Sequence, residues 1–199
     1  MLNSKHTDQD KIAQYQDMIC DQEIMDLTDI IVEESKGELD EKNFIPRLFV
    51  WLMGQENDKS TPSPEHRYPD RKMGIVEIPY IPSDPEEKRQ MMHELGLEIS
   101  KDYSIAAVTL LTAGWMTSRG PIKRTNDSLI PSKDPARQRC VMCMSMTIDG
   151  RAYSHVYLLS QDGDKTIPDK GIKQENAESP LLHIFYQGYL KGITDRGHV

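Results

Sequence analysis

Residues 138–161 read QRCVMCMSMTIDGRAYSHVYLLSQ, and this stretch decides how the chain is expected to fold. From 138 to 148 the residues fall into two alternating sets, which a strand places on opposite faces. The first set is Cys140, Met142, Met144, Met146 and Ile148, and the second is Val141, Cys143, Ser145 and Thr147. Asp149-Gly150 is a preferred pair for a type I′ turn, because both central residues need positive φ. The sequence therefore predicts a hairpin of strands 138–148 and 151–161 whose methionine row is buried.

A two-residue turn at Asp149-Gly150 also predicts the register of this hairpin. It sets Ile148 near Arg151 and Met146 near Tyr153. Because side chains alternate with a period of two, a slip of one residue would move the whole methionine row to the opposite face. The turn is thus expected to control which side chains share a face.

The remaining elements follow from apolar patterning and from helix-start signals. Residues 104–117 are apolar and β-branched, and both faces of 44–53 are apolar, as in a central strand buried on both sides. A short strand is expected at 74–80 and turns at 162–178. Asp84 as a cap and Pro85 at the first helical position predict a helix over 84–103. A second helix is expected over 179–191.

These elements together predict an α+β fold: a mostly antiparallel sheet of about five strands with helices packed on one face. The 199 residues are enough for one domain with a sizeable core. We expect an acidic N-terminal helical segment over 1–42 and a single α+β domain over 43–199.

The net charge of −8 lies entirely within residues 1–42, which hold twelve acidic residues and four lysines. An apolar stripe with acids on its other side predicts a helix over 10–36, with a break near Cys20 as an alternative. This helix could dock on the sheet, of its own chain or of another subunit. It could instead offer an acidic surface to a basic partner, as a nucleic-acid mimic would.

The segment 118–139 is expected to be a long irregular loop that is rich in cations. It carries six Lys or Arg residues against two Asp residues and holds no aromatic residue. Phosphate contacts need only cations and amides, but single-stranded nucleic acid also needs aromatic stacking platforms. A phosphate ligand is therefore conceivable here, and nucleic acid is not an expected partner. Attraction between this loop and the acidic helix is a further hypothesis.

Motifs for catalysis or metal binding are not found. Cys140 and Cys143 lie at an odd offset on one strand, so we expect two buried thiols on opposite faces. His93-Glu94 begins like a zincin motif, but Leu97 stands where the second histidine is needed. We therefore expect no catalytic residue, no metal site and no cofactor. His155 lies on one face with Tyr153 and Tyr157, which is a weak indication of a polar pocket.

The compartment is expected to be the cytoplasm. Three cysteines, an odd number, argue against a disulfide framework and favour a reducing environment. The first residues lack the apolar core of a signal peptide, and no apolar run is long enough for a membrane span. A membrane is accordingly not expected as a partner.

Three segments together resemble a group of uncharacterised prokaryotic and phage proteins. They are Leu111-Thr112-Ala113-Gly114-Trp115-Met116, Pro131-Ser132-Lys133-Asp134-Pro135-Ala136-Arg137 and the Asp149-Gly150 hairpin. In that group a strand ending in Trp-Met leads through a Pro-Ser-x-x-Pro loop to an alternating strand pair. The resemblance covers about a third of the chain, and Gly114 replaces an expected acid. It implies a strand, loop and hairpin, no particular activity, and a site near Trp115 and Arg137.

Two functional hypotheses remain. The first is a non-enzymatic interaction or accessory protein that uses the acidic helix and loop 118–139 to contact a protein partner or to form a homo-oligomer. The second is a small enzyme or phosphate-ligand binder with a site where that loop meets the strand ends. The candidate ligand-binding residues are Trp115, Arg137, Arg139 and His155.

Overall fold

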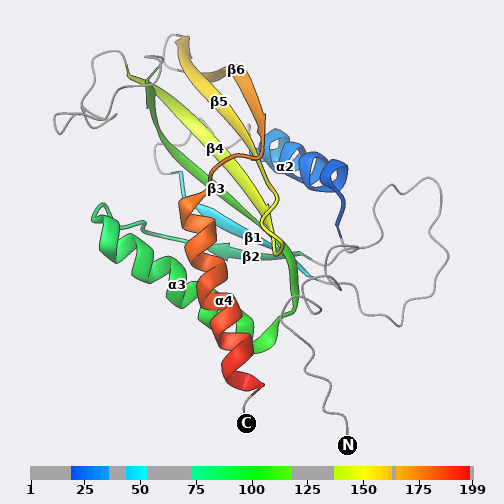
Figure 1. Cartoon of the computed structure of the whole chain (residues 1–199). Helices are drawn as coiled ribbons and strands as arrows, with labels where there is room; N and C mark the ends of the chain where they lie inside the picture. The colour runs from blue at the N-terminus through cyan, green and yellow to red at the C-terminus, as the bar shows by residue number, and fades with distance from the viewer. Residues whose placement is uncertain (1–18, 36–43, 53–72, 118–136, 163–164, 198–199) are drawn as a thin grey trace, which may run out of the picture.

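The computed structural model describes residues 19–35, 44–52, 73–117, 137–162 and 165–197 (Figure 1). The helices in these ranges are α2 (Asp21–Ser35), α3 (Pro85–Asp102) and α4 (Pro180–Arg196). The strands are β1 (Arg47–Leu52), β2 (Met73–Glu77), β3 (Ile105–Thr117), β4 (Arg137–Thr147), β5 (Ala152–Asp162) and β6 (Lys165–Glu175). Within the described part of the chain, the strands form one antiparallel sheet in the order β2-β1-β3-β4-β5-β6. The α+β fold is confirmed, with six strands where about five were expected.

Strand β6 is the element that the sequence did not reveal, since 162–178 was expected to be turns. The segment contains a proline, Pro168, which pairs with Leu159 in the ladder. Proline lacks a backbone donor and is confined to sheet edges and bulges. Both conditions hold here, because β6 is the last strand and the β5–β6 register shifts between Tyr157 and Leu159.

The helices cover both faces of the sheet, so the expectation that they pack on one face is wrong. The α2 helix packs over β3, β4 and β5, whereas α3 and α4 lie on the opposite side (Figure 1). The physical reason is that the central strands are apolar on both faces. Leu110 and Leu111 are neighbours in β3 that point to opposite sides, and both are buried. The expectation of a doubly buried strand at 44–53 is confirmed by β1.

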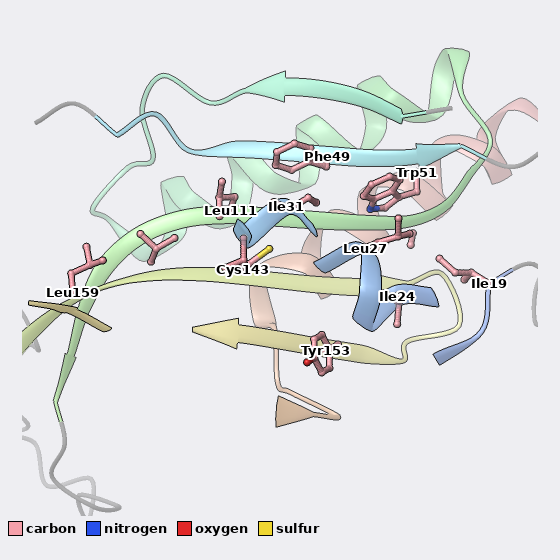
Figure 2. Packing of buried hydrophobic residues seen from close by; sticks show 13 residues of the cluster. Ile19, Ile24, Leu27, Ile31, Phe49, Trp51, Leu111, Cys143, Tyr153 and Leu159 are labelled. Carbon is pink, nitrogen blue, oxygen red and sulfur yellow. The ribbon is translucent and has the colours of Figure 1, made fainter. Parts of the chain in front are cut away.

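Figure 2 shows the core cluster on the α2 side, where Ile24, Leu27 and Ile31 of the helix meet Phe49, Trp51 and other residues of the sheet. The core on the other side contains Met92 of α3 and Phe185 and Tyr189 of α4. Because several apolar residues of α2 are buried against the sheet, the helix is part of the folded unit. The described part of the acidic segment thus docks on the sheet.

Helices α3 and α4 approach each other so closely that a side chain would not fit between them. A Cβ atom on Gly188 would lie 2.0 Å from the carbonyl oxygen of His93. Asp84 caps the start of α3, as predicted, by accepting hydrogen bonds from the backbone N–H groups of Glu86 and Glu87 at 2.9 and 3.0 Å. This tightly packed helix pair covers the face of the sheet opposite α2.

The hairpin between β4 and β5 reverses over three residues, Ile148-Asp149-Gly150, and not over two. Gly150 has φ of +89° and its N–H donates to the carbonyl of Thr147 at 3.0 Å, while the Thr147 N–H donates to the carbonyl of Arg151 at 2.9 Å. A three-residue loop that ends in a left-handed glycine is the bulged form of hairpin turn.

The longer loop shifts the register by one residue relative to the prediction. Met146 pairs with Ala152, and Tyr153 pairs with Ser145. The predicted pairing of Met146 with Tyr153 is wrong. Of the predicted row, Cys140 and Met146 are buried, whereas Met142, Met144 and Ile148 are half-buried, so the expected burial of the methionine row is confirmed in part. Because of this shift, the face of β5 that carries His155 lies beneath α2. His155 can therefore contact Asp29 of that helix.

Candidate functional site

A row of hydroxyl groups crosses the core between the sheet and α2. Trp51 Nε1 donates to Thr109 Oγ1 at 3.0 Å, Thr109 Oγ1 lies 2.7 Å from Ser145 Oγ, and Ser145 Oγ lies 2.5 Å from Thr28 Oγ1. Thr28 donates its proton to the carbonyl of Ile24 at 2.7 Å. Since each hydroxyl has one proton, this fixes the direction: Ser145 donates to Thr28, and Thr109 donates to Ser145. All four side chains are buried, and we call them the hydroxyl row.

Beside the hydroxyl row, Asp29 of α2 links β5 and β6. His155 Nδ1 lies 2.7 Å from Asp29 Oδ1, and Lys173 Nζ contacts the other carboxylate oxygen. His155 is only 3% exposed and stacks on Tyr157 with ring centroids 4.6 Å apart. The Tyr157 hydroxyl donates to Glu33 at 3.1 Å. The hydrogen bond to Asp29 raises the pKa of Lys173 above 10.5. We call Asp29, His155 and Lys173 the α2 clamp.

Cys143 is the cross-strand partner of His155, and His155 contacts Asp29. A cysteine, a histidine and an aspartate are therefore spatial neighbours on the α2 face of the sheet. This order resembles a nucleophilic triad, but its geometry does not support one. Cys143 is wholly buried, and its Sγ lies 3.8 Å from the carbonyl oxygen of Thr28. Burial, and secondarily the charge of Asp29, raises the pKa of the Cys143 thiol. Because only the thiolate is nucleophilic, burial and the raised pKa both disfavour a reaction at Cys143 in the folded state.

His155 is equally enclosed. A Cβ atom on Gly171 would lie 2.8 Å from His155 Nε2, so the second ring nitrogen faces the β6 backbone at close range. The glycine is needed there because any side chain would displace the imidazole. The ring is thus packed closely against β6, and its other nitrogen, Nδ1, is engaged with Asp29.

A hollow of about 420 Å³ lies between α2 and β6 above the α2 clamp. Its lining residues are Gln22, Met25, Asp26, Asp29, Tyr153, Lys173, Gln174 and Glu175. Two of its three acidic lining residues are engaged within the chain: Asp29 with Lys173, and Asp26 with Gln22 at 2.7 Å. At the start of α2, Arg151 binds Asp21 at 2.7 Å and the carbonyl of Ile19 at 2.7 Å. Acids of α2 thus serve to attach the helix.

The four predicted ligand-binding residues do not come together. Trp115 pairs with Arg139, and Thr117 pairs with Arg137, so three of the four occupy adjacent positions at the far end of the β3–β4 ladder. His155 pairs with Cys143, four positions along β4 from Arg139. At ~3.3 Å per residue this is about 13 Å away. Residues 118–136 of the predicted basic loop lie outside the described residues, and 137–139 belong to β4.

Sequence reasoning missed Asp29, Lys173 and Thr28. Asp29 lies 126 residues from His155 and 144 from Lys173, and no local pattern reports such pairs. Thr28 did carry a signal: it is a hydroxyl residue within the apolar stripe of the helix, where a buried polar group requires a partner.

A different region, the outer edge of β2, presents apolar groups to solvent. Ile75 is 55% exposed and Met73 is 42% exposed. In the described part of the chain, β2 has one strand neighbour, β1. Natural sheets usually protect such edges with lysines, prolines or bulges, because free N–H and C=O groups recruit further strands. Residues 73–77, MGIVE, carry none of these devices.

The opposite edge, β6, does carry them. Its sequence KTIPDKGIKQE includes three lysines and Pro168, and it faces a bulge in the ladder with β5. Residues of these types at a sheet edge disfavour the addition of another strand. Among the described strands, one edge of the sheet therefore has a protected sequence and the other does not.

Comparison with protein-family models, curated proteins and solved structures found no match to this chain. The resemblance to uncharacterised prokaryotic and phage proteins stays a prediction. Among the described residues, no three His, Cys, Asp or Glu side chains are grouped as a metal site would need. In the same ranges, no helix combines the length and apolar character that crossing a bilayer requires.

Proposed function

We propose that this chain is a non-enzymatic interaction protein that binds a partner protein through the outer edge of β2. The observation that carries the proposal is the exposed, unguarded strand with Ile75 and Met73 on its surface. In strand addition, main-chain hydrogen bonds supply affinity and alternate side chains supply specificity. Strand β2 offers both, because its backbone edge and its apolar side chains face solvent together.

The side chains of the types that act in catalysis support this proposal, because they are buried or hydrogen-bonded within the chain. The hydroxyl row satisfies its own donors and acceptors, His155 is held by Asp29 and faces Gly171, and Cys143 is buried with a raised pKa. An active site needs at least one reactive group that a substrate can reach. The acidic helix and the segment 118–139 remain proposed as additional contact surfaces.

The test compares three forms of the full-length protein as bait in extracts of its native host. Ile75→Lys places a charge on the open edge, and Ile172→Lys is the matched control on β6, where Ile172 is 41% exposed. We expect the wild type and Ile172→Lys to retain the same specific protein, and Ile75→Lys to lose it. If all three baits retain the same proteins in the same amounts, the proposed function is wrong.

A second candidate function, binding of a phosphate ligand, is favoured by the register at the far end of β3–β4. That register sets Arg139 opposite Trp115 and Arg137 two positions away. Inorganic pyrophosphate should then raise the melting temperature of the wild type, and less so that of Arg137→Ala/Arg139→Ala. Arg89→Ala on α3, an exposed arginine, is the control. An unchanged wild-type melting temperature contradicts this candidate.

A further inference from the structure

We infer that the strand added to β2 is β2 of a second copy of this chain, so that the protein forms a two-fold symmetric dimer. The inference rests on the proposed function of the β2 edge and names its partner. An antiparallel β2–β2 pair would join the two sheets into one continuous sheet, in which the exposed backbone groups of both edges are hydrogen-bonded.

The sequence of β2 is suited to pairing with itself. A two-fold axis through Ile75 sets Ile75 opposite the second copy's Ile75, and Gly74 opposite the second copy's Val76. The nearest atom to a Cβ on Gly74 would be Val50 Cβ at 4.0 Å, so the glycine leaves room for the valine across the axis. On the other face, the two Ile75 side chains cover each other, and on either side Met73 of one copy lies opposite Glu77 of the other. Cross-strand apolar pairs of this kind stabilise antiparallel strands.

The guarded edge at β6 excludes the alternative way of joining two copies. Pairing β2 of one copy with β6 of the next would be a head-to-tail contact that repeats without closing and yields fibres. Pro168 and the three lysines of β6 oppose that contact. Among the described strands, the edge that a second copy offers to β2 is therefore its own β2, and this arrangement closes as a dimer.

The expected contact is small. Five residues from each copy make the contact, of which Met73, Ile75 and Val76 are apolar. Interfaces at the low end of the size range are weak or transient. Dimerisation should accordingly depend on protein concentration within the range that solution experiments reach.

Sedimentation velocity across a dilution series tests the inference. We expect the wild-type mass to rise from 22.8 kDa toward twice that value with increasing concentration, and Ile172→Lys to behave in the same way. Ile75→Lys should remain at 22.8 kDa throughout. A wild type that is monomeric at every concentration overturns the inference, as does an Ile75→Lys variant that dimerises as well as the wild type. If the wild type is monomeric while Ile75→Lys still loses a host protein, only the second-copy inference fails.

A disulfide crosslink between two copies tests whether the two-fold axis passes through position 75. Ile75→Cys in a Cys20→Ser background places two thiols opposite each other, within the Cα separation that a disulfide spans. Oxidised glutathione takes up the two electrons and two protons as the disulfide forms. We expect a covalent dimer from Ile75→Cys and none from Ile172→Cys in the same background. Equal crosslinking of the two variants contradicts a β2–β2 contact.

Discussion

Beneath α2, polar side chains are numerous, buried and bonded to one another, whereas along β2 the side chains are apolar and exposed. The first region holds a cysteine, a histidine and an aspartate, the residue types of catalysis, but its groups are engaged in attaching a helix. The second region consists of Met73, Gly74, Ile75, Val76 and Glu77, and among the described strands its outer edge has no neighbour. The difference teaches that residue type alone does not identify a functional surface: access and unsatisfied bonding capacity do.

The largest expected effect concerns thiol access in the closed region. Cys143 and Cys140 are buried and burial raises both pKa values, whereas Cys20 is exposed. Labelling of Cys143 should require unfolding, and so be slower than that of Cys20 by roughly the unfolding equilibrium constant, about 10³ to 10⁸. Mass spectrometry after timed iodoacetamide treatment measures the rates. Similar labelling rates for Cys143 and Cys20 would show that reagents reach Cys143 in the folded state. A nucleophilic role of Cys143 would then have to be considered.

The next effect is a loss of stability when the hydroxyl row is broken. Thr28→Val keeps the shape of the side chain but leaves the Ser145 hydroxyl without its acceptor, which should cost about 1–3 kcal/mol. Urea unfolding measures the free energy. Thr112→Val is the control, because that hydroxyl makes only one long contact, at 3.4 Å. In a double-mutant cycle with Ser145→Ala, additive losses would show that the two hydroxyls are not coupled.

A smaller effect is expected from the α2 clamp at alkaline pH. Because Asp29 raises the pKa of Lys173, the pair stabilises the fold while Lys173 is charged, and this contribution is lost as pH rises through the raised value. Asp29→Asn should therefore cost no more than about 1 kcal/mol through this pair at neutral pH, since Lys173 is half-exposed. The difference from wild type should narrow above pH 10.5.

Unfolding curves in urea at neutral and alkaline pH measure that difference. Glu34→Gln, on the exposed side of α2, serves as the control and should show no such narrowing. If the difference in unfolding free energy between wild type and Asp29→Asn stays constant or widens above pH 10.5, the ion pair of Lys173 with Asp29 does not stabilise the fold.

The smallest effect should come from the open region. Ile75 is 55% exposed, so the unfolding free energy of the monomer should change by less than about 0.5 kcal/mol in Ile75→Lys. Leu111→Ala, in the core beneath α2, should instead cost about 2–5 kcal/mol. Both are measured at the lowest practical protein concentration. A large loss from Ile75→Lys would mean that β2 is a structural strand and not a contact edge.

Local signals predicted much of the fold. The period of two over 138–148 gave β4, and the Asp84-Pro85 pair gave the start of α3 with its cap. Each of these signals lies within a few residues of the structure it specifies. The sequence of β1, apolar on both faces, likewise indicated a strand covered from both sides.

The candidate site could not be predicted, because it depends on a turn length and on distant partners. Asp149-Gly150 suits a two-residue turn as well as a three-residue loop, and the actual loop moves His155 from the methionine face to the α2 face. Asp29 and Lys173 then meet His155 from elements far along the chain. The β6 strand was hidden because its edge position tolerates Pro168 and Gly171. Strand pairing, not propensity, decides these features.

Amide hydrogen exchange, followed across a concentration series of the full chain, compares the two edges of the sheet most directly. The outward amides of 73–77 should exchange more slowly as the concentration rises, because they become hydrogen-bonded to a second strand, while those of 165–175 should exchange at an unchanged rate. Exchange at 73–77 that is independent of concentration, or slowing that appears at 165–175 instead, would contradict the assignment of β2 as the contact edge.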